Sequence, residues 1–316
     1  MDSYIYKTHN NEFGYFQIDD GVCYTFPMDS SKNYVEKGEW EKHFRLERLG
    51  SPNAATFTLS QQQLLDGMSY FISRNSTKGT ITVVDIHPVN DTGSYFFRTN
   101  RGEPLLSDHQ IKSTYFLDEV RAYENITESL LDIFRTLEPE RNNFTAYGNK
   151  IRELLIISCT EVEYLLQKFL TDSNKQPKYS FYNTGDYVWS LPILKLNLYS
   201  VSAMLFPGLG NLTPFLNWNS SAATQSLAWY DAYNKVKHDR GGTKDKATLE
   251  ALLNSIAAIH ILLEAQYGKE LFEYRFQYTF RTIFQTQNRP TWSMHDFAAP
   301  LLTKQKIEWL TPKKHP

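Results

Sequence analysis

Three polar side chains with chemically useful groups, Asn234, His238 and Arg240, lie close together in the sequence. Asn234 and His238 are four residues apart, so both would lie on the same face of a helix. An imidazole can accept or donate a proton near neutral pH, and an amide or a guanidinium can donate hydrogen bonds to phosphate oxygens. These groups could therefore bind or cleave a phosphodiester. They could equally stabilise a helix end, where a histidine can donate to unpaired carbonyl groups.

The residues around this set predict the helix that would hold it. Hydrophobic and aromatic residues recur every three or four positions before His238, which is typical of a helix with one buried face. Ser220 or Ser221 can cap the start of this helix. Gly241 and Gly242 predict its end, because glycine readily adopts the left-handed conformation that closes a helix.

The stretch from Tyr233 to His238 resembles the signature helix of HEPN-type domains, small helical bundles found in RNA-cutting toxins and in antiviral and abortive-infection proteins. Their usual signature is an arginine, a polar residue that is often asparagine, three further residues and a histidine. Asn234 and His238 match this pattern, whereas Tyr233 stands where the arginine is usual. Because that arginine helps to bind the scissile phosphate, Arg240 or Lys237 would have to supply the positive charge here.

The resemblance implies a metal-independent endoribonuclease of bacterial antiviral defence or stress response. His238 would remove the proton of a ribose 2′-hydroxyl, whose oxygen attacks the adjacent phosphate, while Arg240 or Lys237 stabilises the developing charge. Apart from the resemblance, two carboxylates, Glu161 and Glu163, lie on the long helix before the signature helix. One could face solvent and the other lie at a helix boundary; alternatively, Glu161 packs against the signature helix, where it would orient His238 or pair with Arg240. Family dimers build one composite site from two signature helices. The resemblance therefore also implies an RNA substrate, a homodimer, and no cofactor or metal.

A second hypothesis stays open because Tyr233 carries no positive charge. In it the helical part is a non-catalytic module that dimerises or docks a partner. The N-terminal part would then sense a ligand or a protein that the sequence does not identify. Metal-free RNA cleavage that depends on His238 would separate the two hypotheses.

The composition indicates a globular protein without a broad nucleic-acid surface. The 316 residues are 41% hydrophobic and 15% aromatic, and the net charge of −2 permits only a local basic site. Cys23 and Cys159 are far apart, and the histidines lack the spacing of a zinc site. His260 lies on a hydrophobic helix and is interpreted as a core residue.

Several other classes of protein find no support in the sequence. It contains no glycine-rich phosphate loop and no nucleophile elbow. Its first residues lack the features of a signal peptide, and no hydrophobic run is long enough to cross a membrane. We therefore expect a cytoplasmic protein that does not bind membranes.

The hydrophobic period changes along the chain and predicts an α+β protein. Residues 1–112 should form a β-rich domain. Residues 113–276 should form the HEPN-like helical bundle, interrupted at about 177–219 by an insertion of strands and loops. Residues 277–316 are expected to be a C-terminal extension.

In the first domain, the period of two predicts strands at 4–6, 13–18, 22–26, 80–86 and 94–98, the last two paired. Asp20 and Gly21 predict a hairpin turn, and Ser60 and Gln63 a capping box that starts a short helix. Residues 28–52 are expected to be an exposed connection.

In the second domain, helical spacing predicts long helices over about 117–137, 151–169 and 249–263. The last should be the most buried, because it is hydrophobic around much of its circumference. Alternating residues predict strands at 179–182 and 194–199 in the insertion.

Overall fold

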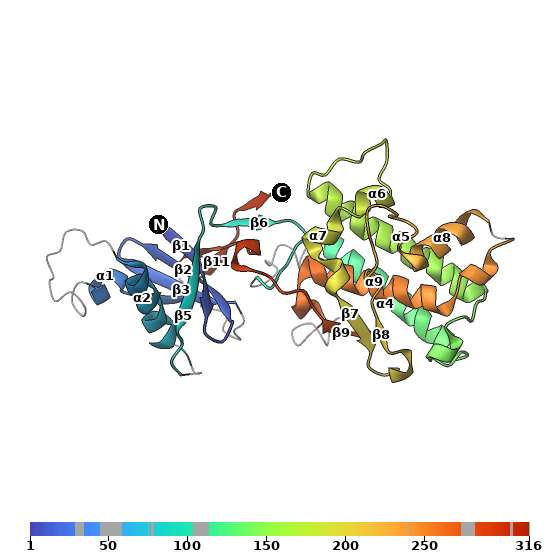
Figure 1. The fold of residues 1–316 in the computed structure, drawn as a ribbon, viewed down its shortest axis with the longest axis horizontal. Coiled ribbons are helices and arrows are strands. Elements are labelled where there is room, and N and C mark those ends of the chain that lie inside the picture. Colours follow the sequence, from blue (N-terminus) through green and yellow to red (C-terminus); the bar gives the residue numbers. More distant parts are fainter. Residues whose placement is uncertain are drawn as a thin grey trace. The chain divides into compact units, whose positions relative to one another are not determined.

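The computed structural model describes residues 1–28, 35–44, 59–74, 76, 79–103, 114–239, 241–272, 282–303 and 306–315. Its fold is α+β with a β-rich N-terminal part, as predicted. The chain forms two compact units (Figure 1). The β-rich unit comprises Met1–Phe96, Arg101–Leu105 and Trp292–Lys313, and the helical unit comprises Phe97–Asn100, Leu106–Thr291 and Lys314–Pro316.

A five-stranded antiparallel sheet with the order β4-β3-β2-β1-β5 is the centre of the β-rich unit. Asp20 and Gly21 join β2 to β3 with φ angles of 46° and 73°, the conformation that a tight hairpin turn requires. The predicted meander and its turn are thus confirmed. The strands are β1 (Asp2–Thr8), β2 (Phe13–Asp19), β3 (Val22–Pro27), β4 (Glu36–Gly38) and β5 (Val83–Pro88).

Both faces of this sheet are covered by hydrophobic side chains. One face packs against α1 (Trp40–Lys42) and α2 (Gln61–Arg74), and α2 begins with the predicted capping box between Ser60 and Gln63. The other face packs against residues 292–302. The first core includes Phe16, Trp40, Met68 and Phe71, and the second includes Ile5, Tyr15, Met294 and Phe297.

Two predictions for the β-rich unit are wrong. The strands predicted at 80–86 and 94–98 do not pair with each other. β5 pairs with β1, and β6 (Ser94–Phe96) pairs in parallel with β12 (Thr311–Lys313). Within the predicted exposed connection, the described residues 35–44 contribute buried side chains to the cores; residues 29–34 and 45–52 lie outside the described residues. A further antiparallel pair joins β10 (Leu301–Thr303) to β11 (Lys306–Glu308).

The helical unit is organised around α9 (Leu249–Tyr267), which contacts the other three long helices. Every residue of α9 except Glu250 and Asn254 is buried, which confirms the predicted core helix. By length and composition α9 could cross a membrane, but 89% of its most hydrophobic window is buried inside the protein. The surrounding helices are α4 (Thr114–Phe134), α5 (Asn149–Asp172), α8 (Ala228–His238) and the shorter α6 (Thr184–Tyr187) and α7 (Ser190–Leu194).

The stripe predicted for α5 is buried along its whole length, because hydrophobic residues there recur at helical spacing. Ser158 also belongs to the stripe, and its hydroxyl pairs with that of Ser255 on α9 at 2.7 Å. The other buried members are Ile151, Leu154, Leu155, Val162, Leu165, Leu166 and Phe169.

The strands predicted in the insertion are wrong. Asn183 and Asp186 form a capping box that starts α6, so residues 179–182 are a loop. Residues 194–199 run from the end of α7 into a 3₁₀ turn, with Lys195 in the left-handed conformation at φ 49°. The insertion instead gives β7 (Ser200–Ala203) and β8 (Asn211–Leu212), which join β9 (Phe284–Asn288) in a sheet with the order β8-β7-β9.

The residues predicted as a C-terminal extension contribute to both units. β9 adds a strand to the helical unit, whereas Trp292–Lys313 belongs to the β-rich unit. The predicted boundary at residue 112 lies outside the described residues. Hydrophobic period does not reveal such a division, because it reports which side of a segment is buried and not what covers it.

Candidate functional site

The candidate signature helix α8 ends at His238, as predicted, but side-chain hydrogen bonds close it in place of a left-handed glycine. Asp239 accepts hydrogen bonds from the backbone N–H groups of Gly241 and Gly242, at 3.1 and 2.9 Å. The Thr243 hydroxyl donates to the carbonyl of Lys235, one of the unpaired groups of the last turn. Neither glycine has a positive φ, so the predicted left-handed stop is wrong.

The start of α8 also differs from the prediction. The helix begins at Ala228 after a series of turns, and neither Ser220 nor Ser221 caps it. The Ser221 hydroxyl donates to the side chain of Asn219, and the Ser226 hydroxyl to the Asn219 carbonyl. These local side-chain bonds favour turns over a longer helix.

Tyr233, at the position where the signature usually has arginine, is fully buried. Its hydroxyl donates to Glu163 of α5 at 3.3 Å, and the Tyr230 hydroxyl donates to the same carboxylate at 2.5 Å. The ammonium of Lys237 donates to the Tyr233 hydroxyl oxygen at 2.8 Å. A continuous chain of hydrogen bonds therefore links the Lys237 ammonium to a carboxylate on the neighbouring helix.

Burial and hydrogen bonding set the protonation of Tyr233 and Lys237. Burial raises the pKa of the Tyr233 hydroxyl, while the hydrogen bond from Lys237 lowers it and Glu163 raises it further. The hydrogen bond to Tyr233 raises the pKa of Lys237. Tyr233 therefore stays neutral and Lys237 stays positively charged, which places a cation one residue before His238.

The three residues predicted as catalytic are not joined by hydrogen bonds in the described structure. Asn234 is half-buried and His238 is exposed. Their side chains make no hydrogen bond to any residue that the structure describes. Arg240 lies outside the described residues. Among the residues that the structure describes, none donates to or accepts from the His238 imidazole at this helix end.

Glu163, and not Glu161, is the carboxylate of α5 that contacts α8, through the hydroxyls of Tyr230 and Tyr233. Residues two apart point to nearly opposite sides of a helix, so only one of this pair can face α8. Glu161 lies near Glu119 and Arg98, and burial followed by Glu119 raises the pKa of Glu161 to about 7, while Arg98 opposes the shift. Both carboxylates flank Val162 of the buried stripe, so the spacing of the stripe did not distinguish them.

Arg98 anchors a buried polar cluster close to Glu161. Its guanidinium donates two hydrogen bonds to Glu119 of α4, at 2.8 and 2.9 Å, and one to Gln266 of α9. The Tyr267 hydroxyl donates to Glu119 at 2.6 Å. Arg98 and Glu119 side chains are only 7% and 1% exposed, so this is a structural ion pair and not a binding site.

Replacing Glu119 with alanine should destabilise the helical unit by about 3–5 kcal/mol, because it removes the closest partner of the buried Arg98 charge and leaves Asp172, 3.9 Å away. Urea denaturation followed by circular dichroism measures the change. The control is Asp132→Ala, which removes the exposed pair with Arg135 and should cost about 1 kcal/mol or less. Equal losses for both variants would contradict the assignment.

His260 is a buried core residue, as predicted. Its ring nitrogens lie 3.2 Å from the hydroxyls of Tyr123 and Thr282 and 3.1 Å from that of Thr286. Thr286 in turn donates to Glu264 at 2.5 Å. Burial, with a smaller contribution from a nearby arginine, lowers the pKa of His260 to about 3, so the folded protein holds the ring neutral.

The unfolded chain binds a proton at this histidine below its ordinary pKa, whereas the folded chain does not. The contribution of His260 to stability is therefore complete above pH 6.5 and is lost as the pH falls toward 3. Between pH 7.5 and pH 5 we expect wild type to lose about 2 kcal/mol more unfolding free energy than His260→Gln. Parallel pH dependences of the two proteins would contradict a neutral buried His260.

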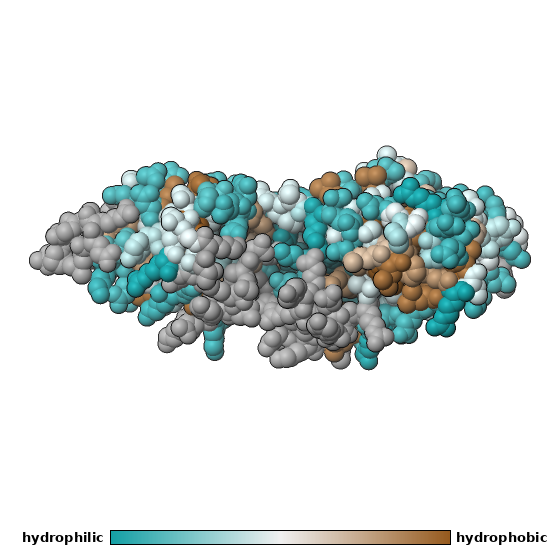
Figure 2. All heavy atoms as spheres, turned by 90° about the horizontal axis from the view of Figure 1, so that it is seen from below, coloured by the Kyte–Doolittle hydropathy of each residue, from teal (hydrophilic) through white to brown (hydrophobic). Residues whose placement is uncertain are grey.

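A groove in the helical unit is a second candidate site. It has a volume of about 1490 Å³ and lies between α4, β9 and the turn after β7. Arg289 and Glu264, joined by hydrogen bonds of 2.6 and 3.1 Å, lie in its wall. Met204 and Leu205, 67% and 79% exposed, line the groove. Figure 2 shows a hydrophobic area on this unit.

Comparison with protein families, with characterised proteins and with solved structures finds no match to this chain. Within the described residues, no group of three or more histidine, cysteine, aspartate or glutamate side chains is placed to hold a metal ion. The function must therefore be inferred from the two sites themselves.

Proposed function

We propose that the protein is a metal-independent endoribonuclease of bacterial defence or stress response that works as a cytoplasmic homodimer with a HEPN-like bundle. The observation that carries the proposal is the hydrogen bond from Lys237 to Tyr233. It fixes a cation on the residue that precedes the exposed His238, although the arginine of the usual signature is absent. A positive charge and a titratable imidazole at one helix end are what cleavage of a phosphodiester needs.

The chemistry assigns one role to each residue. His238 takes the proton of the ribose 2′-hydroxyl, and the 2′-oxygen forms a bond to the adjacent phosphorus while the bond to the 5′-oxygen breaks. Lys237 stabilises the charge that develops on the phosphate oxygens, and Asn234 donates a hydrogen bond to the same phosphate. The products are a 2′,3′-cyclic phosphate and a 5′-hydroxyl, which receives its proton from the partner copy's site or from water.

Incubation of the purified protein with total RNA in excess EDTA tests the proposal. The expected result is cleavage by wild type, with cyclic-phosphate or 3′-phosphate ends. His238→Ala should be folded, of the same oligomeric state and inactive. Cleavage that needs added divalent ions, or that persists in His238→Ala, would reject the mechanism. Absence of cleavage by either protein would favour the second function below.

The groove beside Met204 and Leu205 supports a second candidate function, a non-catalytic interaction module. Large exposed hydrophobic side chains next to a groove are typical of surfaces that bind other proteins. In this function the bundle docks a partner or a second copy, and the β-rich unit senses a ligand or partner of its own. Met204→Ser/Leu205→Ser should then weaken self-association or partner binding, as measured by sedimentation, while wild type and variant alike leave RNA uncleaved in the EDTA assay.

A further inference from the structure

The loop between α5 and α6, residues 173–183, exposes two large aromatic side chains. Tyr179 is 64% exposed and Phe181 is 71% exposed. Aromatic rings usually bury most of their area, because their transfer from water is strongly favourable. Two neighbouring rings held in solvent therefore call for a ligand that covers them.

Hydrogen bonds fix the backbone of this loop. Asp186 accepts from the backbone N–H groups of Lys178 and Asn183, at 2.9 and 3.0 Å. The Tyr182 hydroxyl donates to the carbonyl of Lys175 at 2.7 Å. Because these bonds close the loop on itself, its exposed rings are presented on an ordered backbone, which reduces the entropy lost when a ligand binds.

The exposed charges of the loop are positive. Residues 173–183 contain Lys175 and Lys178 and no acidic residue. The Lys178 ammonium lies 5.6 Å from the centre of the Tyr179 ring, and Lys175 lies 5.3 Å from the ring of Trp189. Neither lysine forms a salt bridge with a residue that the structure describes. The loop thus combines exposed lysines with flat hydrophobic surfaces.

We propose that this loop is a stacking platform for single-stranded RNA, on which Tyr179 and Phe181 stack against bases while Lys175 and Lys178 contact phosphates. Flat rings with nearby lysine ammonium groups match the two chemical features that every nucleotide of a single strand offers, a base face and a phosphate. A duplex offers no free base faces, so the platform favours unpaired RNA. The assignment rests on RNA being the substrate, and it gives the chain a binding site separate from His238.

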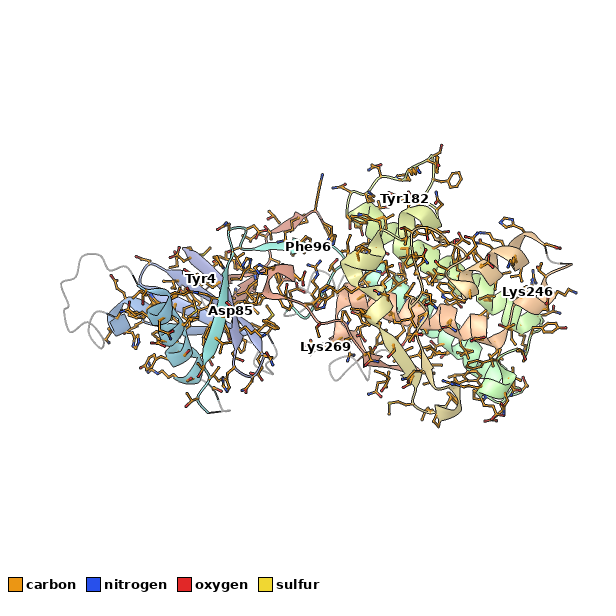
Figure 3. All side chains as sticks on the ribbon, viewed as in Figure 1. Tyr4, Asp85, Phe96, Tyr182, Lys246 and Lys269 are labelled. Carbon is orange, nitrogen blue, oxygen red and sulfur yellow. The ribbon has the colours of Figure 1, made fainter. Side chains whose placement is uncertain are left out.

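The platform and the end of α8 lie apart on the helical unit. Figure 3 shows Tyr182, within the loop, well apart from Lys246, which lies in the short turn after α8. RNA binding should therefore be separable from cleavage. Changes in the platform should raise KM for long single strands with little effect on kcat, and should not affect cleavage of RNAs too short to reach it.

Fluorescence anisotropy of a labelled 2′-O-methyl RNA of about 16 nucleotides tests the platform. This RNA has no free 2′-hydroxyl, so binding by the full chain is measured whether or not the protein cleaves RNA. We expect Tyr179→Ala/Phe181→Ala to weaken binding by about 30-fold or more, and Tyr179→Trp to retain it. Lys175→Gln/Lys178→Gln should reduce the slope of log affinity against log salt by about 1.4.

The control is Tyr147→Ala, which removes an aromatic ring that is 58% exposed on the same unit but outside the loop. All variants are checked for folding by circular dichroism. Equal binding by wild type and the double alanine variant would overturn the platform. The platform would also be overturned if wild type cleaved RNA without binding the labelled strand. Binding of the protein to anionic lipid vesicles but not to RNA would overturn it as well. The proposed function is judged separately, by cleavage in EDTA and its dependence on His238.

Discussion

Replacing His238 with alanine is expected to lower the rate of RNA cleavage by about 10²–10⁴-fold, the usual contribution of a general base. His238 is exposed and makes no hydrogen bond within the described structure, so its removal should leave the fold intact. The variant should therefore keep wild-type stability and RNA affinity while losing turnover. Single-turnover cleavage of a labelled RNA in EDTA, beside thermal unfolding and anisotropy, measures all three quantities.

Two outcomes would count against this role. If His238→Ala loses stability and affinity together with activity, the histidine is structural and acts at the helix terminus. If the variant keeps its activity, another residue is the base. A parallel measurement on His238→Gln, which preserves hydrogen bonding but cannot take up a proton, distinguishes proton transfer from simple positioning.

If the protein is the proposed ribonuclease, replacing Lys237 with glutamine should lower kcat/KM by about 10²-fold, because it removes the cation that we propose stabilises the phosphate charge. The fixed position of this ammonium depends on Tyr233, whose hydroxyl accepts its hydrogen bond. Tyr233→Phe should therefore cause a smaller loss than Lys237→Gln, since it frees the lysine without removing its charge. Lys237→Arg should retain part of the activity.

Lys244→Gln is the matched control for this experiment. Lys244 is an exposed lysine shortly after α8 and has no salt bridge within the described structure, so it tests the effect of net charge alone. Similar losses for Lys237→Gln and Lys244→Gln would show that only general electrostatic attraction of RNA is involved. In that case the hydrogen bonds to Tyr233 and Glu163 have a purely structural role.

Features that depend on local periodicity could be predicted from the sequence. The α5 stripe, the buried helix α9 and the meander of β1 to β3 all follow from a repeated spacing of hydrophobic residues. The position of His260 in the core follows for the same reason. In each case the burial of one residue is set by neighbours within a few positions.

Features that depend on distant partners could not be predicted. The pairing of β6 with β12 joins residues that are more than 200 positions apart, and no local pattern identifies such a partner. Residues 194–199 alternate like a strand, yet a left-handed Lys195 ends α7 there. The choice between Glu161 and Glu163 depended on which side of α5 faces α8, which periodicity leaves open.

Residues 292–302, which pack on one face of the five-stranded sheet, are synthesised long after the strands of that sheet. Tyr15 donates to the carbonyl of Ala298, and Gln17 exchanges hydrogen bonds with Pro300 and Leu302. The ribosome must make the whole segment 106–291 before these partners exist. Until then the nascent sheet has one open hydrophobic face, which makes the unfinished chain prone to aggregation.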